Sequence, residues 1–134
     1  MPAFVDTNVL IHYLTGEDDA KAKRCLALLQ RAQNRAADLF TSDLVVAEAV
    51  WVLQSRSGVS RERIRDLLLP VMRLPGLRVP NKQSWPRVFD LYCERRIDFI
   101  DAYNAVTMER AGITDIYSYD RDFDGLEGIT RMEP

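Results

Sequence analysis

The chain has little of the side chains on which several common kinds of chemistry depend. It contains one histidine, His12, and two cysteines, Cys25 and Cys93, among its 134 residues. The cysteines lie far apart in the sequence and match no metal-binding spacing, so we expect two reduced thiols in a cytoplasmic protein. Nothing near His12 resembles a Ser-His-Asp or Cys-His set, and we therefore expect His12 to be a structural or surface residue.

Long apolar runs and an excess of basic charge are also absent. No run approaches the roughly 20 apolar residues that span a bilayer, and the first residues lack the basic and apolar regions of a secretory signal. The formal net charge of −2 does not suggest a nonspecific coat for nucleic acid, although 18 Lys and Arg residues allow local basic patches. No glycine-rich phosphate loop follows the first apolar segment, which argues against the usual nucleotide-binding folds.

Short apolar segments alternate with helical patterns along the whole chain. We find no repeat, low-complexity tract or linker, which predicts a single domain over residues 1–134. The alternation predicts a parallel sheet covered by helices on both faces, with a ligand site outside the carboxyl ends of the strands. The predicted strands are 3–5, 39–41, 77–79, 113–119 and a short last one at 128–131. The predicted helices are 9–14, 18–36, 43–54, 60–72, 84–95 and 99–111, with Pro70 a kink or early end of the fourth.

Four acidic residues stand where a charge is costly unless something compensates it. Asp6 and Asp120 follow predicted strands, whereas Glu48 and Asp101 belong to apolar helical patterns. One cation could compensate all four carboxylates. Because hard oxygen ligands favour Mg²⁺ or Mn²⁺ over Zn²⁺, the pattern indicates a metal-dependent enzyme.

Two of these acids also have structural interpretations. Asp6 could cap the helix that starts near Val9, but Thr7 and Asn8 cap well too, and one helix start does not require three capping residues. Glu48 could form a buried ion pair with an arginine from elsewhere in the chain. This second interpretation follows from the expected apolar surroundings of Glu48 on its helix, which are Leu44, Val45, Trp51 and Val52.

The remaining acids come in neighbouring groups, and the assignment within each group stays open. Asp98 is the natural N-cap of the last long helix, and Asp101 belongs to its first turn, where a negative charge suits the helix dipole. We favour Asp101 as the ligand and Asp98 as the cap. Asp120 is nearest the end of its strand, Asp122 is a second contributor or an alternative to it, and Asp124 is expected to be peripheral.

Four segments of the chain together resemble the PIN-domain ribonucleases, and among these the VapC toxins of prokaryotic toxin–antitoxin pairs. In order, the segments are 4–10 (FVDTNVL), 47–53 (AEAVWVL), 98–105 (DFIDAYNA) and 118–123 (SYDRDF). The resemblance implies a three-layer α/β/α sandwich with a short, mainly parallel central sheet. It also implies RNA as the substrate, a homodimer and a small antitoxin protein as inhibitor. The implied site consists of the metal ligands Asp6, Glu48, Asp101 and Asp120 (or Asp122), with Thr7 or Asn8 as a polar helper.

The hypothesis that follows is cleavage of RNA by water that a bound Mg²⁺ or Mn²⁺ activates. Basic residues must then hold the flanking phosphates; Arg121 is the first candidate, and Lys82 and Arg96 are two more. A phosphoaspartate signalling domain would need a second acid beside Asp6, and a haloacid-dehalogenase-like phosphatase would need an aspartate at Asn8. A non-catalytic RNA-binding or assembly module on the same fold is the remaining alternative.

Overall fold

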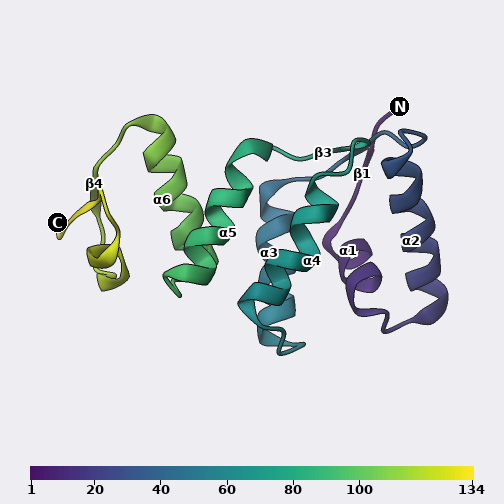
Figure 1. Cartoon of the computed structure of the whole chain (residues 1–134), viewed down its shortest axis with the longest axis horizontal. Helices are drawn as coiled ribbons and strands as arrows, with labels where there is room; N and C mark the ends of the chain where they lie inside the picture. Colours follow the sequence, from purple (N-terminus) through teal and green to yellow (C-terminus); the bar gives the residue numbers. More distant parts are fainter. The chain divides into compact units, whose positions relative to one another are not determined.

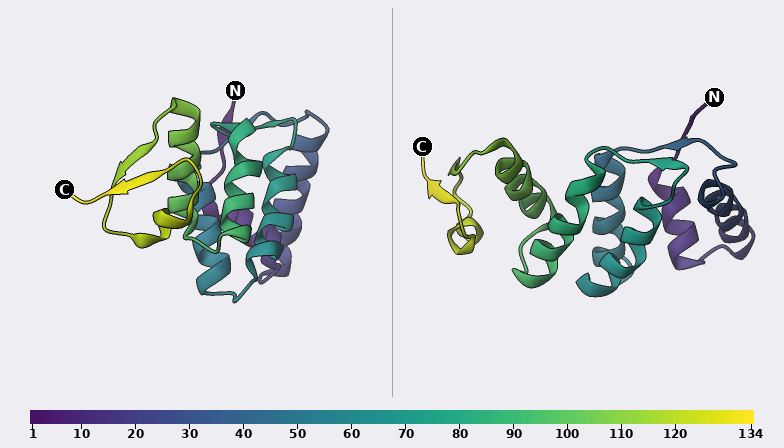
Figure 2. Two further views of the ribbon diagram at one scale, coloured as in Figure 1. Left: turned by 60° about the vertical axis from the view of Figure 1, so that its left-hand side comes forward. Right: turned by 45° about the horizontal axis from the view of Figure 1, so that its top comes forward.

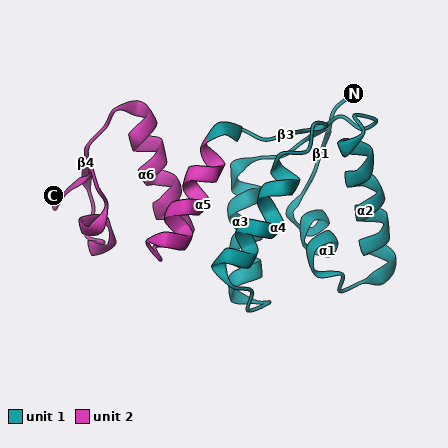
Figure 3. Ribbon diagram, in the orientation of Figure 1, with its two compact units in different colours: residues 1–83 teal, residues 84–134 magenta.

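A computed structural model of the chain describes residues 1–134 and has two compact units. Unit 1 is Met1–Gln83 and unit 2 is Ser84–Pro134 (Figure 3). Helices and parallel strands alternate within the chain, and none of the helices has the length and apolar character needed to span a membrane (Figure 1). The predicted α/β fold class is confirmed, whereas the single domain over 1–134 stays a prediction.

Unit 1 is built on three short parallel strands in the order β1-β2-β3. These are β1 (Ala3–Phe4), β2 (Leu39–Phe40) and β3 (Leu77–Arg78). The hydrogen bonding continues one residue past β1, because the N–H of Val5 donates to the carbonyl of Phe40 at 2.8 Å. The hydroxyl of Thr41 donates to the carbonyl of Val5 at 2.8 Å, so the carboxyl ends of β1 and β2 are tied together.

Four helices complete unit 1, and each begins with a polar side chain that accepts a hydrogen bond from a backbone N–H. The capping residues are Asp6, Asp18, Ser42 and Ser60. Helix α1 lies against α2 and α3, and α3 lies against α4. The helices are α1 (Thr7–Thr15), α2 (Asp19–Gln33), α3 (Asp43–Ser55) and α4 (Arg61–Met72). Their buried side chains include Leu10, Leu29, Val46, Val50, Leu53, Ile64 and Leu68.

The turn that leads into β3 requires a glycine. A Cβ atom at Gly76 would lie 2.4 Å from the carbonyl oxygen of Ala37 and 2.6 Å from that of Ala32. The backbone of Gly76 also links α2 to β2. Its N–H donates to the carbonyl of Ala32 at 2.9 Å, and its own carbonyl accepts from the N–H of Leu39 at 2.8 Å. Both contacts are with backbone atoms, so a side chain here would displace the end of α2 from the start of β3.

Unit 2 packs two helices through a cluster of aromatic rings. Helix α5 (Trp85–Glu94) contributes Trp85 and Phe89, whose ring centroids lie 6.0 and 5.2 Å from that of Phe99 on α6 (Phe99–Ala111). Strand β4 (Asp115–Tyr117) pairs in parallel with β5 (Thr130–Met132), at the yellow end of the chain (Figure 2). Two 3₁₀ helices complete the chain, η1 (Lys82–Ser84) and η2 (Arg121–Gly125).

The predicted elements are all found, but the strands are shorter than expected and form two hydrogen-bonded sheets. All pairings are parallel, as predicted, with three strands in unit 1 and two in unit 2. Pro70 does not end its helix, which continues to Met72. Cys25 and Cys93 are free, as expected.

Candidate functional site

Asp6 lies between the first strand and the first helix of unit 1. Its backbone is extended, with φ −86° and ψ 163°, and its Oδ1 accepts a hydrogen bond from the N–H of Thr7 at 2.8 Å. Asp6 is therefore the N-cap of α1, as one of the two sequence interpretations held. The cap uses Oδ1, so Oδ2 can still act as a ligand toward a cation.

Asp6 and Glu48 line the same open pocket, although 42 positions separate them in the sequence. The tied ends of β1 and β2 explain why the residues that follow these strands approach one another. Asn8 is exposed at this pocket, while Thr7 is buried in the first turn of α1. The full lining consists of Asp6, Thr7, Asn8, Ile11, Glu48, Trp51, Val52 and Arg56.

The predicted burial of Glu48 is wrong. Its side chain is exposed, and so are its neighbours Leu44, at 76%, and Trp51, at 58%. Apolar residues occur almost all the way around α3, so their angular positions do not identify the face that packs. The buried face is formed by Val45, Val46, Ala49, Val50 and Leu53. Glu48 thus needs no buried arginine partner, and the desolvation argument does not apply to it.

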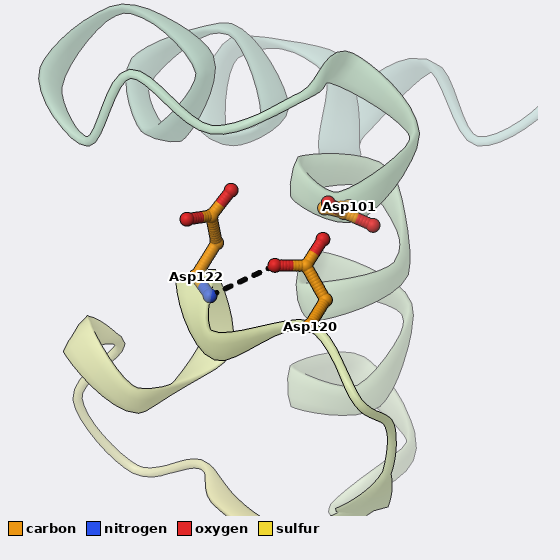
Figure 4. A group of neighbouring side chains, drawn as sticks. All are labelled: Asp101, Asp120 and Asp122. Carbon is orange, nitrogen blue, oxygen red and sulfur yellow. Dashed lines mark hydrogen bonds between the residues drawn. The ribbon is translucent and has the colours of Figure 1, made fainter.

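Three aspartates of unit 2 come together in space. Asp101 belongs to the first turn of α6, as predicted, whereas Asp120 and Asp122 begin η2. One carboxylate oxygen of each lies within 4.8 Å of the others, and Figure 4 shows the three side chains as neighbours. The N–H of Asp122 donates to Oδ1 of Asp120 at 2.9 Å, and the N–H of Asp120 donates to Oγ of Ser118 at 3.0 Å. This turn presents both carboxylates to Asp101.

The charges in this aspartate cluster oppose one another. Partial burial raises the pKa of Asp101 from 3.8 to about 6, and the charge and hydrogen bond of Asp120 and the charges of Asp98 and Asp122 add to this rise. Burial and the three neighbouring acids are thus the main causes of the raised pKa of Asp101. Crowded carboxylates without a cationic partner favour either a shared proton or a bound cation. The donor set consists of oxygen alone, which fits Mg²⁺ or Mn²⁺.

The acids flanking this cluster play other parts. Asp124 is peripheral, as expected, because Nε of Arg131 donates to its Oδ1 at 2.8 Å, and this bond lowers the pKa of Asp124. Asp98 occupies the N-cap position of α6, but its side chain makes no capping hydrogen bond, so this part of the prediction is wrong. The backbone of Asp98 at φ −59° and ψ 147° starts the helix without the help of its carboxylate.

The three predicted phosphate-binding residues differ in their surroundings. Arg121 is exposed and lies between Asp120 and Asp122 in the chain. The ammonium group of Lys82 donates to the carbonyls of Leu74 and Leu77 at 3.3 and 3.2 Å, which ties it to the turn that leads into β3. Arg96 has a left-handed backbone, with φ 58°. These surroundings favour Arg121 over Lys82.

Sequence reasoning missed two residues of the pocket in unit 1. The sequence predicts Trp51 only as an apolar neighbour of Glu48, and no pattern in it points to Arg56. In the structure the guanidinium carbon of Arg56 lies 5.7 Å from the centre of the Trp51 ring, and both residues line the pocket. Their five-residue spacing matches no recognised helical pair, so no sequence signal identifies them.

Comparison with known proteins adds one finding. The family model described as "PIN domain" matches residues 3–129, which include both the pocket of unit 1 and the aspartate cluster of unit 2. No curated protein matches the chain significantly.

Proposed function

Because the chain belongs to the PIN domain family, whose members are generally nucleases, we propose that it is a metal-dependent endoribonuclease. The observation that carries this proposal is the aspartate cluster of unit 2, formed by Asp101, Asp120 and Asp122. Three carboxylates that crowd one another without a basic partner are suited to a divalent cation. The alternative is a non-catalytic RNA-binding or assembly module on the same fold.

The carboxylates of the chain would hold Mg²⁺ or Mn²⁺. In unit 2 the ligands are Asp101 and Asp120, with Asp122 as a further oxygen donor. We propose that Asp6 and Glu48 of unit 1 are required as well, and the pocket that they share supports this. When bound, the cation supplies the Lewis acidity that lowers the pKa of water and offsets negative charge on the phosphate.

Other side chains would position the RNA rather than the cation. Asn8 lines the pocket with Asp6 and Glu48, and its amide can donate a hydrogen bond to a phosphate oxygen. Arg121 is exposed beside the aspartate cluster and can bind a flanking phosphate. Such basic contacts are needed because the acids repel the RNA backbone. The chain's single histidine is not needed as a base in this chemistry.

We also propose a biological setting, which rests on the resemblance of the four sequence segments to VapC. In this setting the protein is the cytoplasmic toxin of a toxin–antitoxin pair, acts as a homodimer and is inhibited by a small antitoxin. A short neighbouring gene for a DNA-binding antitoxin would support this assignment. Co-expression of that gene should relieve growth arrest caused by the chain, and failure to do so would contradict the assignment.

The experiment that tests the enzyme is cleavage of end-labelled RNA by the purified chain, with Mg²⁺, with Mn²⁺ or with EDTA. We expect metal-dependent cleavage that is lost in Asp101→Asn and in Glu48→Gln. Asp90→Asn is the matched control, because Asp90 is an exposed aspartate of α5 outside both the pocket of unit 1 and the aspartate cluster. This variant should cleave like the wild type. Equal cleavage in EDTA, or full activity of Asp101→Asn, would refute the metal site. Metal binding with no cleavage of any RNA would favour the non-catalytic alternative.

A further inference from the structure

The two tryptophans of the chain have opposite environments. Trp85 is 1% exposed and stacks on Phe99 inside unit 2. Trp51 is 58% exposed on α3, three residues after Glu48, so it faces the same side of the helix as that acid. A large aromatic ring that contributes little to its own core and lines a pocket of candidate ligands is available to bind another molecule.

Arg56 gives this exposed ring a cationic neighbour. It is the C-cap residue of α3, and its backbone N–H donates to the carbonyl of Val52, which fixes the start of its side chain. The guanidinium carbon lies 5.7 Å from the centre of the Trp51 ring. Because Trp51 is still 58% exposed with Arg56 over its ring, more than half of the side chain is open to a ligand.

We propose that Trp51 and Arg56 form a binding site for one unpaired nucleotide of the RNA substrate. The base stacks on the exposed part of the Trp51 indole, and the Arg56 guanidinium binds a phosphate of the same nucleotide. The site adjoins Asp6 and Glu48, because all four residues line one pocket. This inference rests on the proposed function and assigns it a substrate contact, with unpaired RNA as the preferred form.

The chemistry of the pocket favours a nucleotide over an apolar protein segment. An apolar partner that covered Trp51 would also desolvate Arg56, Asp6 and Glu48, and charged groups without new partners make such burial costly. A nucleotide avoids this cost, because its phosphate supplies a partner for the arginine while its base covers the ring. Duplex RNA keeps its bases stacked inside the helix, so only an unpaired base can reach the indole.

The test measures binding without cleavage, in EDTA, on the full chain. The probe is a ten-nucleotide oligouridine or oligoadenosine, compared with a duplex of the same length. Trp51 emission should be quenched by the single strands and not by the duplex, and Trp51→Phe should remove this signal because Trp85 is buried. Trp51→Ala should weaken binding of a fluorescent single strand about five- to hundredfold.

Two further variants separate stacking from general effects on the surface. Leu44→Ala is the matched control, because Leu44 is 76% exposed on the same helix but does not line the pocket. This variant should bind the single strand with the affinity of the wild type. Arg56→Ala should reduce the slope of log Kd against log salt concentration by about 0.7, as expected for one lost phosphate contact on a single strand. An unchanged slope would overturn the phosphate assignment.

The remaining outcomes distinguish this site from the enzyme proposal. If Trp51→Ala and Leu44→Ala bind the fluorescent single strand with equal affinity, the nucleotide site is overturned, even if the wild type cleaves RNA with Mg²⁺. Quenching that Trp51→Phe abolishes, without cleavage under any metal, supports the nucleotide site and refutes the enzyme. If Trp51→Ala changes the oligomeric state and leaves RNA affinity unchanged, the ring belongs to a contact between copies of the chain and the proposal is wrong.

Discussion

The backbone N–H of Asp122 holds the carboxylate of Asp120, through a 2.9 Å hydrogen bond to Oδ1. The donor is a main-chain group, so it persists when the side chain of Asp122 is changed. Asp120 therefore keeps its orientation toward Asp101 in any variant of Asp122 that preserves the turn. The separate contributions of Asp120 and Asp122 to RNA cleavage can therefore be measured.

We predict that Asp120→Asn damages cleavage more than Asp122→Asn. The first variant removes a held ligand charge, whereas the second removes a charge from the edge of the cluster and should cost about 10- to 100-fold, as changes around a metal site commonly do. The measurement is kcat/KM together with the Mg²⁺ concentration for half-maximal activity. A larger loss in Asp122→Asn would make Asp122, rather than Asp120, the main metal ligand of this segment.

The raised pKa of Asp101, about 6, predicts a pH dependence of stability without metal. Between pH 3.8 and 6 the folded state binds this proton more tightly than the unfolded state does. The free energy of unfolding contributed by Asp101 is therefore greatest below this window and falls as pH rises through it. Thermal melts in EDTA from pH 4 to 7 should show a decline that is weaker in Asp101→Asn. Solvent screening of this partly exposed group reduces the size of the effect, and identical pH profiles would contradict it.

Divalent cations should stabilise the chain at pH 7. A cation that binds only the folded state at 100 times its Kd adds about 2.7 kcal/mol to the free energy of unfolding. We expect the melting temperature to rise with Mg²⁺ or Mn²⁺ in the wild type and in Asp90→Asn, and to rise much less in Asp101→Asn. An equal rise in all three proteins would indicate cation binding elsewhere.

Because the Asp98 side chain makes no capping hydrogen bond, Asp98→Ala should lower the free energy of unfolding by less than the removal of a true capping side chain does. Ser42→Ala and Ser60→Ala should each lower stability by about 0.5–2 kcal/mol, since these hydroxyls accept from Val45 and Arg63 at 3.2 Å. We expect a loss below about 0.5 kcal/mol for Asp98→Ala, measured by urea unfolding. A loss as large as that of the serine variants would show that Asp98 caps α6 in solution.

Asp6 should reveal its two roles through two different variants. Asn caps helices as well as Asp, so Asp6→Asn should keep the bond from Thr7 and the stability while losing cleavage. Asp6→Ala should lose both, with a stability cost of about 0.5–2 kcal/mol. Urea unfolding and RNA cleavage of the pair are sufficient. Full activity in Asp6→Asn with Mg²⁺ would exclude Asp6 as a ligand.

Local sequence signals predicted most of the fold because they depend on short-range physics. Apolar spacing and end signals located the six helices, as the caps at Ser42 and Ser60 and the left-handed Gly112 illustrate. The approach of Asp101 to Asp120 also followed from pattern, since one begins a helix and the other follows a strand.

The features that sequence reasoning missed depend on packing. The apolar residues around α3 concealed which face is buried, so Glu48 and Trp51 were assigned to the wrong environment. The hydrogen bonds of Lys82 to the carbonyls of Leu74 and Leu77 likewise have no signal in the sequence. The partner of a charged residue depends on which groups lie near it in the folded chain. The spacing of residues along a single sequence does not show this.

The close approach at Gly76 affects how a mutational survey of this chain would be interpreted. Every substitution there meets backbone oxygen atoms of Ala32 and Ala37, so all nineteen replacements should be depleted in a selection for activity. The position would then score like a catalytic residue, although it belongs neither to the pocket of unit 1 nor to the aspartate cluster of unit 2. Abundance measured in parallel would separate the two cases, because Gly76 variants should vanish from the folded pool while Asp101→Asn stays in it.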